Sequence, residues 1–311
     1  MAPKITLLAG GTGGARLAVG FQAVLPPGHL SVITNIADDI EMWGLKICPD
    51  TDAVLFRLGG IFDEQKGYGL AEESFTLLDQ MGRLGEETWF RLGDRDLAFH
   101  VLRTERLHAG ARLTEAIAEL VDRLKITARV LPVTDDVVAT YFETAAGRLG
   151  FQEYFVRERM GPALKGIVFA GLKKAKPSPE ALAAVKEADL VIIGPSNPLI
   201  SIAPITTLLR STLDPARTVA ISPLVGGIAL KGPTVEMLRS LCGEATPEQV
   251  AREYKGLAEW FVLDQVDWAR ADAVNEAGCR PLRLDTVMRD ESGAQRLAEA
   301  ILEQFQLSVG R

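Results

Sequence analysis

The chain has few of the residues that form covalent cross-links or His-rich metal centres. Among its 311 residues are three cysteines and three histidines. Cys48, Cys242 and Cys279 lie far apart and form no C-x-x-C pair, so neither a disulfide framework nor a zinc site built on cysteines is expected. Three histidines are too few for a His-rich metal site.

Long apolar runs and an excess of positive charge are also lacking. No apolar run approaches the roughly 18 residues of a membrane span, and the N-terminus MAPKITLLAGG has no signal-peptide cleavage pattern. We therefore expect a cytoplasmic protein that does not bind membranes. The net charge of −7 argues against a nucleic-acid partner. What the chain does have is 47% hydrophobic residues and 29 glycines, ample material for a buried core.

Apolar runs typical of buried strands alternate with segments of helical period. The strand-like runs cover residues 4–10, 30–36, 166–172, 190–195, 218–227, 259–265 and 280–286. Helical patterns such as SPEALAAVKEA and SGAQRLAEAILEQF lie between or after them. Near-continuous Val, Ile and Leu strands divided by helices predict a mostly parallel sheet covered on both faces. The expected fold is a Rossmann-like three-layer α/β sandwich.

Residues 53–125 interrupt this alternation with three helix-like segments, AEESFTLLDQMG, LAFHVLRTERL and TEAIAELVDRL. We interpret them as a helical insertion that forms one wall of the active cleft. Because no low-complexity linker divides the chain, we predict a single α/β domain over residues 1–311. ITARVLPVT and VVATYFET then look like strands joined by a turn at Asp135 and Asp136.

A glycine-rich turn, LAGGTGGAR (8–16), follows the first strand and opens a helix. Free backbone N–H groups and the helix dipole can bind phosphate at such a place. The dinucleotide fingerprint G-x-G-x-x-G/A begins at Gly11 but fails at Arg16, and no G-K-[ST] of a Walker A loop is present. Glycines that serve only the turn remain an alternative. We favour phosphate binding, with the class of cofactor left open.

The stretch NIADDIEMWGLKICPDTD (35–52) places Asp38, Asp39, Asp50 and Asp52 among apolar residues. An acidic residue near the end of the second strand would suit a ribose hydroxyl in an NAD enzyme, but that leaves the second acidic pair unexplained. Two carboxylates brought together across a loop, with phosphate oxygens completing the shell, commonly bind Mg²⁺. Asp38 and Asp50 are the candidate ligands. Asp39 and Asp52 could instead cap helices, since Asp52 precedes the helix-like AVLFRL.

Two later loops follow strands, where open α/β sheets bind ligands. GPSNPLISIAP (194–204) offers the side chains of Ser196 and Asn197 for hydrogen bonds, although prolines and small residues could also serve a purely structural turn. SPLVGGIALKGP (222–233) brings two glycines near Lys231, a plausible phosphate contact.

An earlier segment, RLGDRDLAFH (91–100), gathers charge at the start of a helix. Arg91, Asp94 and Arg95 are candidate ligand contacts there. Asp94 could simply cap the helix, and ion pairs on a solvated face would also explain the cluster.

Taken in order, these segments resemble the CofD/FbiA family. The segments that carry the resemblance are GGTGGARLAVG, the NxxDD element, CPDTDAVLF, LGDRDLAFH, LTEA, LPVTDD, FQEYFVRER, GPSNPLISIAPI and SPLVGGIALKGP. They run from residue 5 to beyond residue 230, and RLDTVM (283–288) resembles the family's C-terminal part. The family comprises the 2-phospho-L-lactate or phosphoenolpyruvate transferases of deazaflavin coenzyme F-420 biosynthesis.

The resemblance implies a reaction. The acceptor would be FO, which is 7,8-didemethyl-8-hydroxy-5-deazariboflavin, and the donor a guanosine diphosphate derivative carrying lactate or enolpyruvate on its terminal phosphate. The ribityl 5′-hydroxyl of FO would attack that phosphorus, and GMP would leave. Catalysis of this type is mostly positioning plus neutralisation of spread negative charge. The family also suggests a homodimer.

The resemblance implies roles for particular residues. Asp38 and Asp50 would hold Mg²⁺ on the donor diphosphate. Asp52 would lie close to the attacking hydroxyl, where we expect orientation more than proton removal, because an unperturbed carboxylate is a weak base for an alcohol. The implied substrate contacts are Gly10, Gly11, Thr12, Gly13, Gly14, Arg91, Asp94, Arg95, Gly194, Ser196, Asn197, Ser201 and Lys231.

Two other functions compete with the transferase. A nucleotide-sugar-binding regulator of the YvcK type shares the glycine-rich turn and the sheet, but would not be expected to carry LGDRDLAFH together with FQEYFVRER, the segments associated with FO. An NAD-dependent dehydrogenase fails at Arg16 and offers no account of CPDTD. We therefore expect a magnesium-dependent transferase.

Overall fold

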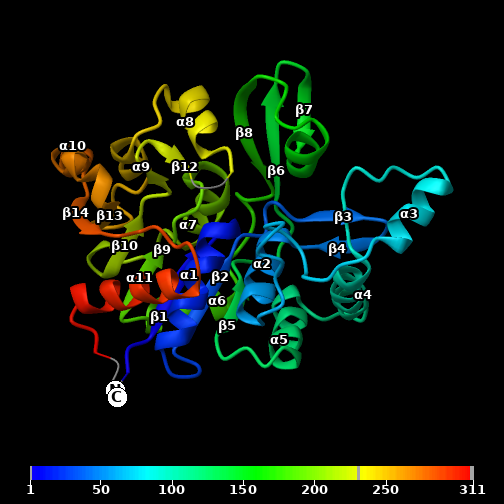
Figure 1. Ribbon diagram of the computed structural model, residues 1–311, viewed down its shortest axis with the longest axis horizontal. Helices are drawn as coiled ribbons and strands as arrows, with labels where there is room; N and C mark the ends of the chain where they lie inside the picture. The colour runs from blue at the N-terminus through cyan, green and yellow to red at the C-terminus, as the bar shows by residue number, and fades with distance from the viewer. Residues whose placement is uncertain (1, 230–231, 309–311) are drawn as a thin grey trace.

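A seven-stranded parallel sheet forms the centre of the computed structural model, which describes residues 2–229 and 232–308 (Figure 1). The strand order is β14-β13-β10-β9-β1-β2-β5, and each neighbouring pair is parallel. The strands are β1 (Ile5–Ala9), β2 (Leu30–Thr34), β5 (Arg129–Pro132), β9 (Leu190–Ile193), β10 (Thr218–Ile221), β13 (Trp260–Asp264) and β14 (Arg280–Leu284).

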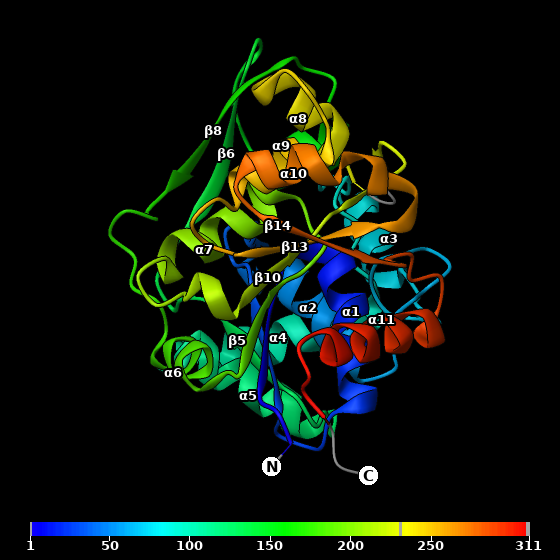
Figure 2. The same cartoon turned by 90° about the vertical axis from the view of Figure 1, so that its left-hand side faces the viewer.

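Helices cover both faces of this sheet, which confirms the predicted three-layer α/β fold. On one face, α1 (Gly11–Val24) packs against α2 (Pro49–Leu58) and α11 (Glu291–Gln304). On the other face lie α6 (Pro179–Glu187) and α7 (Ala203–Leu209) (Figure 2). The double cover explains the uninterrupted apolar runs: every residue of β1, β2, β9 and β10 is buried, so neither face of these strands can be polar.

Six more α-helices lie in the described ranges. They are α3 (Thr76–Arg83), α4 (Asp94–His108), α5 (Leu113–Arg123), α8 (Thr234–Cys242), α9 (Pro247–Glu253) and α10 (Ala271–Ala277). Two π-helical turns span Glu153–Arg157 and Pro198–Ile202. Across the described ranges, every helix is too short or too polar to cross a membrane.

One predicted strand lies outside the central sheet. Residues 166–172 correspond to β8 (Leu164–Ala170), which pairs antiparallel with β6 (Ala139–Thr144). Together with β7 (Gly147–Gly150), they form a three-stranded sheet that stands apart from the central one (Figure 1). Most residues of β8 are only half-buried, unlike those of the central strands. An apolar run alone does not say which sheet a strand joins, so our placement was wrong here.

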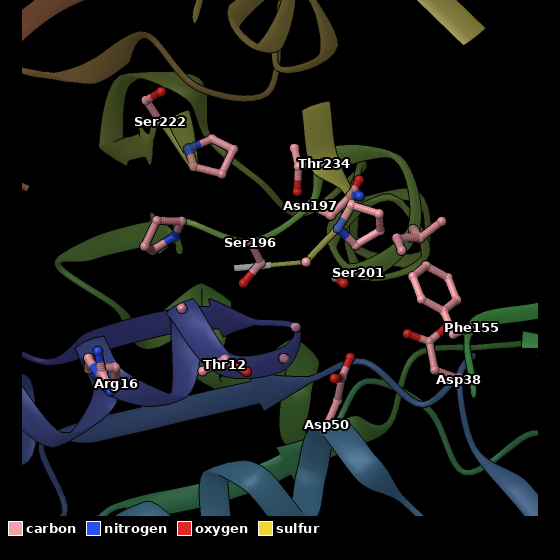
Figure 3. Close-up of a pocket in the computed structure, with 18 of the residues that line it drawn as sticks. Thr12, Arg16, Asp38, Asp50, Phe155, Ser196, Asn197, Ser201, Ser222 and Thr234 are labelled. Atoms are coloured by element: carbon pink, nitrogen blue, oxygen red, sulfur yellow. The ribbon is translucent and has the colours of Figure 1, made fainter. Parts of the chain in front are cut away.

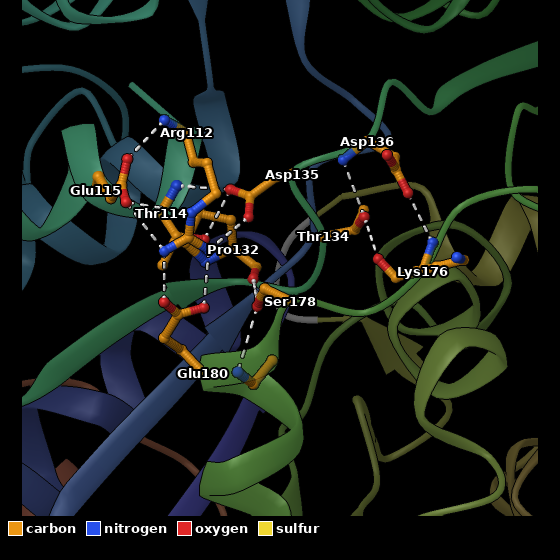
Figure 4. Close-up of polar contacts among 11 residues, drawn as sticks. Arg112, Thr114, Glu115, Pro132, Thr134, Asp135, Asp136, Lys176, Ser178 and Glu180 are labelled. Atoms are coloured by element: carbon orange, nitrogen blue, oxygen red, sulfur yellow. Dashed lines mark hydrogen bonds and ion pairs between the residues drawn. The ribbon is translucent and has the colours of Figure 1, made fainter. Parts of the chain in front are cut away.

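The turn predicted between ITARVLPVT and VVATYFET connects β5 to β6, which belong to different sheets and do not form a hairpin. Side chains anchor it (Figure 4). Asp135 accepts a hydrogen bond from Arg112 at 3.1 Å, and Arg112 also pairs with Glu180 of α6 at 2.7 Å. Asp136 accepts one from the backbone N–H of Lys176 at 2.7 Å. The turn is thereby tied to both α5 and α6.

Residues 53–125 divide into two parts. The helices α2 and α5 pack against α1 and β5 respectively, as part of the layer that covers the sheet. The helices α3 and α4 extend outward from it, next to a hairpin of β3 (Ile40–Met42) and β4 (Leu45–Ile47) (Figure 1). That the whole chain forms one domain stays a prediction.

The hairpin β3–β4 was not expected from the sequence. Its turn residues Trp43 and Gly44 have φ values of 53° and 71°, as two-residue hairpin turns of type I′ require. Tryptophan is an unusual residue for that conformation, so the turn carries no Asn-Gly or Asp-Gly signal. Leu92 and Leu97 pack beneath the hairpin and bury its apolar face.

The order of the strands also locates the ligand site. From β1 the chain continues to β2 on one side, whereas β9 joins β1 on the other, so the direction of winding reverses between β1 and β9. Open α/β sheets bind ligands outside the carboxyl ends of the strands at such a switch point. The turn between β1 and α1 and the loop after β9 meet there.

Candidate active site

A cavity of about 290 Å³ opens at the carboxyl edge of the central sheet (Figure 3). Nine residues predicted to bind the donor or the metal line it: Gly10, Gly11, Thr12, Gly13, Asp38, Asp50, Ser196, Asn197 and Ser201. Gly14 and Gly194 lie behind this wall, where a Cβ added to Gly194 would be 3.2 Å from the Cα of Gly14. Lys231 lies outside the described residues. Segments distant in the sequence thus converge on one site.

The glycine-rich turn needs glycine at several positions for steric reasons. A Cβ on Gly10 would lie 2.4 Å from the Cβ of Ser201, and one on Gly13 would lie 2.2 Å from the carbonyl oxygen of Pro195. Gly11 adopts a left-handed φ of 68°, which side chains rarely tolerate. The glycines therefore let two loops approach backbone to backbone.

The same turn also leaves an anion site. Helix α1 begins at Gly11, and its N-cap residue, Gly10, has no side chain with which to cap it. Its first N–H groups have no partners within the helix, and they lie beside the cavity together with the positive end of the helix dipole. Such a terminus binds phosphate or carboxylate groups. A structural role and a phosphate-binding role are compatible here.

Two of the four aspartates in residues 35–52 are neutralised by cations. Lys46 Nζ lies 2.9 Å from Asp39, and Arg103 donates to both carboxylate oxygens of Asp52. The prediction that Asp52 could be the N-cap residue of a helix is wrong, because α2 begins at Pro49 and its N-cap residue is Cys48. Asp52 lies in the first helical turn, where its carboxylate accepts the Cys48 N–H at 3.3 Å.

The other two, Asp38 and Asp50, face the cavity without a cationic partner in the described ranges (Figure 3). Asp38 accepts from the hydroxyl of Thr140 at 3.1 Å, and Asp50 from the side-chain amide of Asn35 at 3.0 Å. Burial raises the pKa of Asp38 well above its ordinary value, and the charge of Asp50 raises it further. Burial likewise raises the pKa of Asp50 to about 7, against the hydrogen bond from Asn35. The pair is therefore short of positive charge.

This pair fits a divalent cation that arrives with a phosphate ligand. No group of three or more His, Cys, Asp or Glu side chains within the described ranges could hold a metal by itself. Mg²⁺ does not need such a cage, because it usually keeps several waters and is bound through one or two carboxylates plus phosphate oxygens. A cation at Asp38 and Asp50 would offset the repulsion that raises the pKa of Asp38.

A second cavity, of about 220 Å³, adjoins the first and shares Gly11, Thr12 and Asp50 with it. Its other walls include Asp52, Phe56, Phe62, Tyr68, Phe90, Arg91, Asp96 and His100. Arg91 is exposed, and its guanidinium lies 4.3 Å from the ring centroid of Phe75. The second cavity is therefore lined by several aromatic rings together with ionisable side chains, and it meets the first cavity at Gly11, Thr12 and Asp50.

Asp94 and Arg95, also predicted to bind substrate, line neither cavity. The carboxylate of Asp94 accepts from the Ser74 hydroxyl at 2.7 Å and from the backbone N–H groups of Thr76 and Leu77 at 2.9 and 3.0 Å. These hydrogen bonds, that from Ser74 foremost, lower the pKa of Asp94 to about 2. Asp94 thus caps the start of α3. The alternative that we considered was that it caps α4, the helix in which it lies. The guanidinium of Arg95 donates to the carbonyl oxygen of Ala71, in the loop that precedes α3.

Sequence reasoning missed several lining residues of the first cavity, including Arg16, Phe151, Phe155 and Thr234. Arg16 occupies the position at which the dinucleotide fingerprint fails, and it donates to the carbonyl oxygen of Met288 at 2.8 Å. Phe151 and Phe155 stack with ring centroids 4.6 Å apart, and Phe155 lies beside Asp38 (Figure 3). Their spacing of four residues on a helical turn was a signal that could have been used.

The order of the strands and the cavity at their carboxyl ends define a doubly wound α/β protein whose ligand site lies at the switch point. Among solved structures, a crystal structure of a UPF0052 family member from Bacillus halodurans has a TM-score of 0.62 and 17% identity, covering 97% of this chain and 99% of that one. At this identity the likeness shows the fold alone.

Sequence comparisons identify the family. A sequence model described as "2-phospho-L-lactate transferase CofD" matches residues 5–302. The 2-phospho-L-lactate transferase of Methanosarcina mazei is 35% identical over 301 residues, covering 96% of this chain and 99% of the relative. The phosphoenolpyruvate transferase of Streptomyces coelicolor is 38% identical over 311 aligned residues, covering 96% and 97%. The chain therefore belongs to the CofD family of transferases.

Proposed function

We propose that this chain transfers a 2-phospho-L-lactyl or phosphoenolpyruvyl group from its guanosine 5′-diphosphate donor to the 5′-hydroxyl of FO, with Mg²⁺, in coenzyme F-420 biosynthesis. The names of the relatives support the transferred group. The observation that carries the proposal is the pair of cavities that meet at Gly11, Thr12 and Asp50, because a transferase must bring a donor and an acceptor together at one point.

The first cavity suits the donor. The N-terminus of α1 would bind the diphosphate, and Asn197 and Ser201 would lie on the guanosine side. Mg²⁺ at Asp38 and Asp50 would supply positive charge against the phosphate oxygens. The chain's own contribution is to fix the donor so that its terminal phosphorus faces the second cavity.

The second cavity suits the acceptor. Its aromatic side chains fit a flat ring system, and Asp52 is one of the polar residues in its wall. In the reaction, the acceptor oxygen bonds to the terminal phosphorus, the bond from that phosphorus to the bridging oxygen breaks, and its electron pair leaves with GMP. The hydroxyl proton passes to solvent. Because Arg103 occupies both oxygens of Asp52, we assign that carboxylate to orienting the hydroxyl.

The test is a transfer assay with purified protein, FO and either donor, with and without Mg²⁺. Wild type should convert FO and release GMP, and both Asp50→Asn and removal of the metal should abolish conversion. Asp122→Asn, at an exposed position of α5, is the matched control and should behave as wild type.

Two outcomes would contradict the proposal in different ways. Conversion that survives Asp50→Asn unchanged would remove the metal from this site but keep the transfer. Wild type that neither converts FO nor binds it, as followed by FO fluorescence, would overturn the transferase and favour a nucleotide-binding regulator.

A further inference from the structure

Arg103, on α4, is the largest fully buried side chain of the described ranges, with 0% of its surface exposed. Its guanidinium donates to both oxygens of Asp52 on α2, one of them at 3.1 Å, and to the carbonyl oxygen of Lys46 on β4 at 3.2 Å. One buried charge therefore joins three elements of the structure.

Stability alone does not explain this pair. Removing two charges from water costs several kcal/mol per ion, and apolar residues of similar volume in place of a buried ion pair are often neutral or stabilising. What a guanidinium supplies beyond charge is a fixed fork geometry, through which two parallel hydrogen bonds set the orientation of a carboxylate. The pair thus has to be judged by what it positions.

What it positions is a pair of ionisable side chains in the wall of the second cavity. Arg103 does not line that cavity, but its partners Asp52 and His100 both do. Nη1 of Arg103 lies 3.4 Å from Nδ1 of His100, and His100 Nε2 lies 3.3 Å from Asp96 Oδ1. Nδ1 of His100 thus faces the guanidinium, and Nε2 faces the carboxylate of Asp96. Arg103 thus orients the side chains of the cavity from behind.

We infer that Arg103 is a positioning residue for the transfer. It holds the Asp52 carboxylate in the wall of the second cavity, two residues from Asp50, which lines both cavities, so that the carboxylate receives the acceptor hydroxyl in line with the donor phosphorus. This inference rests on the proposed function. Each carboxylate oxygen has two acceptor positions, so Oδ1 of Asp52 keeps one for that hydroxyl after binding Arg103. Asp52 also lies two residues after Asp50 in the first turn of α2, so the same contact fixes the turn that carries the metal ligand.

The test replaces the forked guanidinium group of Arg103 but keeps its positive charge. In Arg103→Lys a single ammonium cannot bind both oxygens of Asp52 in the same way. We expect kcat to fall about 10- to 100-fold, because displacements near 1 Å cost up to about 10² in rate. KM for donor and acceptor should stay within about threefold, as should the affinity for FO measured by fluorescence. Arg106→Lys is the matched control: it lies on the same helix, pairs with Glu119 at the surface, and should keep the wild-type kcat.

A second pair of variants separates positioning from folding. Arg103→Met leaves the charge of Asp52 buried and unpaired and should lower Tm, whereas Asp52→Asn combined with Arg103→Met removes both charges and should restore Tm. The double variant should nevertheless keep a low kcat and still bind FO.

Three outcomes would overturn the inference. They are a wild-type kcat in Arg103→Lys, a loss confined to KM, and a double variant that regains kcat together with Tm. An inactive wild type would be a different failure, of the proposed function itself, and this inference would fall with it.

Discussion

Replacing Gly13 by alanine should damage the site by forcing two loops apart. The added Cβ would lie 2.2 Å from the carbonyl oxygen of Pro195, whereas Cβ contacts under 3.0 Å are essentially never seen. The gap between the first turn of α1 and the loop after β9 must therefore widen by about 0.8 Å. The obstacle is backbone, so no side-chain rotation can relieve it.

Both stability and activity should respond. Overpacking of this kind costs about 1–3 kcal/mol, which for a chain of this length lowers Tm by about 2–5 °C. Transfer should suffer more, because a shift near 1 Å between the glycine-rich turn and the loop carrying Ser196 and Asn197 costs on the order of 10² in rate. Differential scanning fluorimetry gives Tm, and the transfer assay at saturating donor and FO gives kcat.

The control for this prediction is Gly166→Ala on β8, where the nearest atom to the new Cβ is the Cβ of Glu143 at 4.0 Å. It should leave both quantities unchanged. Gly13→Ala with wild-type Tm and wild-type kcat would refute the close approach of the two loops.

Three further predictions follow from particular residues. In Gly20→Ala the new Cβ would lie 2.2 Å from the carbonyl oxygen of Ala294 on α11, so Tm should fall by about 2–5 °C. The value of kcat should stay unchanged, since neither residue lines either cavity, and a normal Tm would contradict the prediction. Because the folded pKa of Asp94 is lowered to about 2, its hydrogen bonds stabilise the fold above the unfolded pKa of about 3.9, and this contribution is lost as the pH falls towards 2. The difference in urea midpoint between wild type and Asp94→Asn should therefore shrink between pH 5 and pH 2.5, and a constant difference would refute this reasoning. Asp50 has the opposite sign: its raised folded pKa of about 7 makes the metal-free fold less stable as the pH rises through 7, so Mg²⁺ should raise the wild-type Tm more at pH 8 than at pH 6, and equal rises at both values would count against the site.

The sequence predicts the central strands well because burial on both faces leaves near-continuous apolar runs. It fails for β8, whose residues GIVFA are as apolar as a central strand although the strand has a half-exposed place in another sheet. It fails also for the hairpin β3–β4, whose turn at Trp43 and Gly44 uses a conformation that tryptophan rarely adopts. Both failures arise where tertiary packing decides between local alternatives.

The candidate site is predictable for a different reason. In a parallel sheet the carboxyl ends of strands meet at one edge, so polar residues just after β1, β2 and β9 must converge. Residues on other elements that pair with the site residues show no such pattern in the sequence. Arg103 lies 51 residues from Asp52 within a helix whose charged residues mostly reach solvent, and nothing in the sequence separates it from Arg106 three residues later. The pairing that distinguishes Asp52 from Asp50 had to be seen in three dimensions.

The common wall of the two cavities has a consequence for inhibition. Gly11, Thr12 and Asp50 border both cavities, so no layer of protein separates the two. Under the proposed function, a single compound that joins a nucleoside diphosphate to a flat aromatic group would therefore reach both. Once one half is bound, the other would be held at millimolar effective concentration, and the gain over either half alone would be about 10²–10⁴-fold with a linker that matches the span. A short bisubstrate molecule, rather than a competitor for either space, is the form of ligand that this architecture favours.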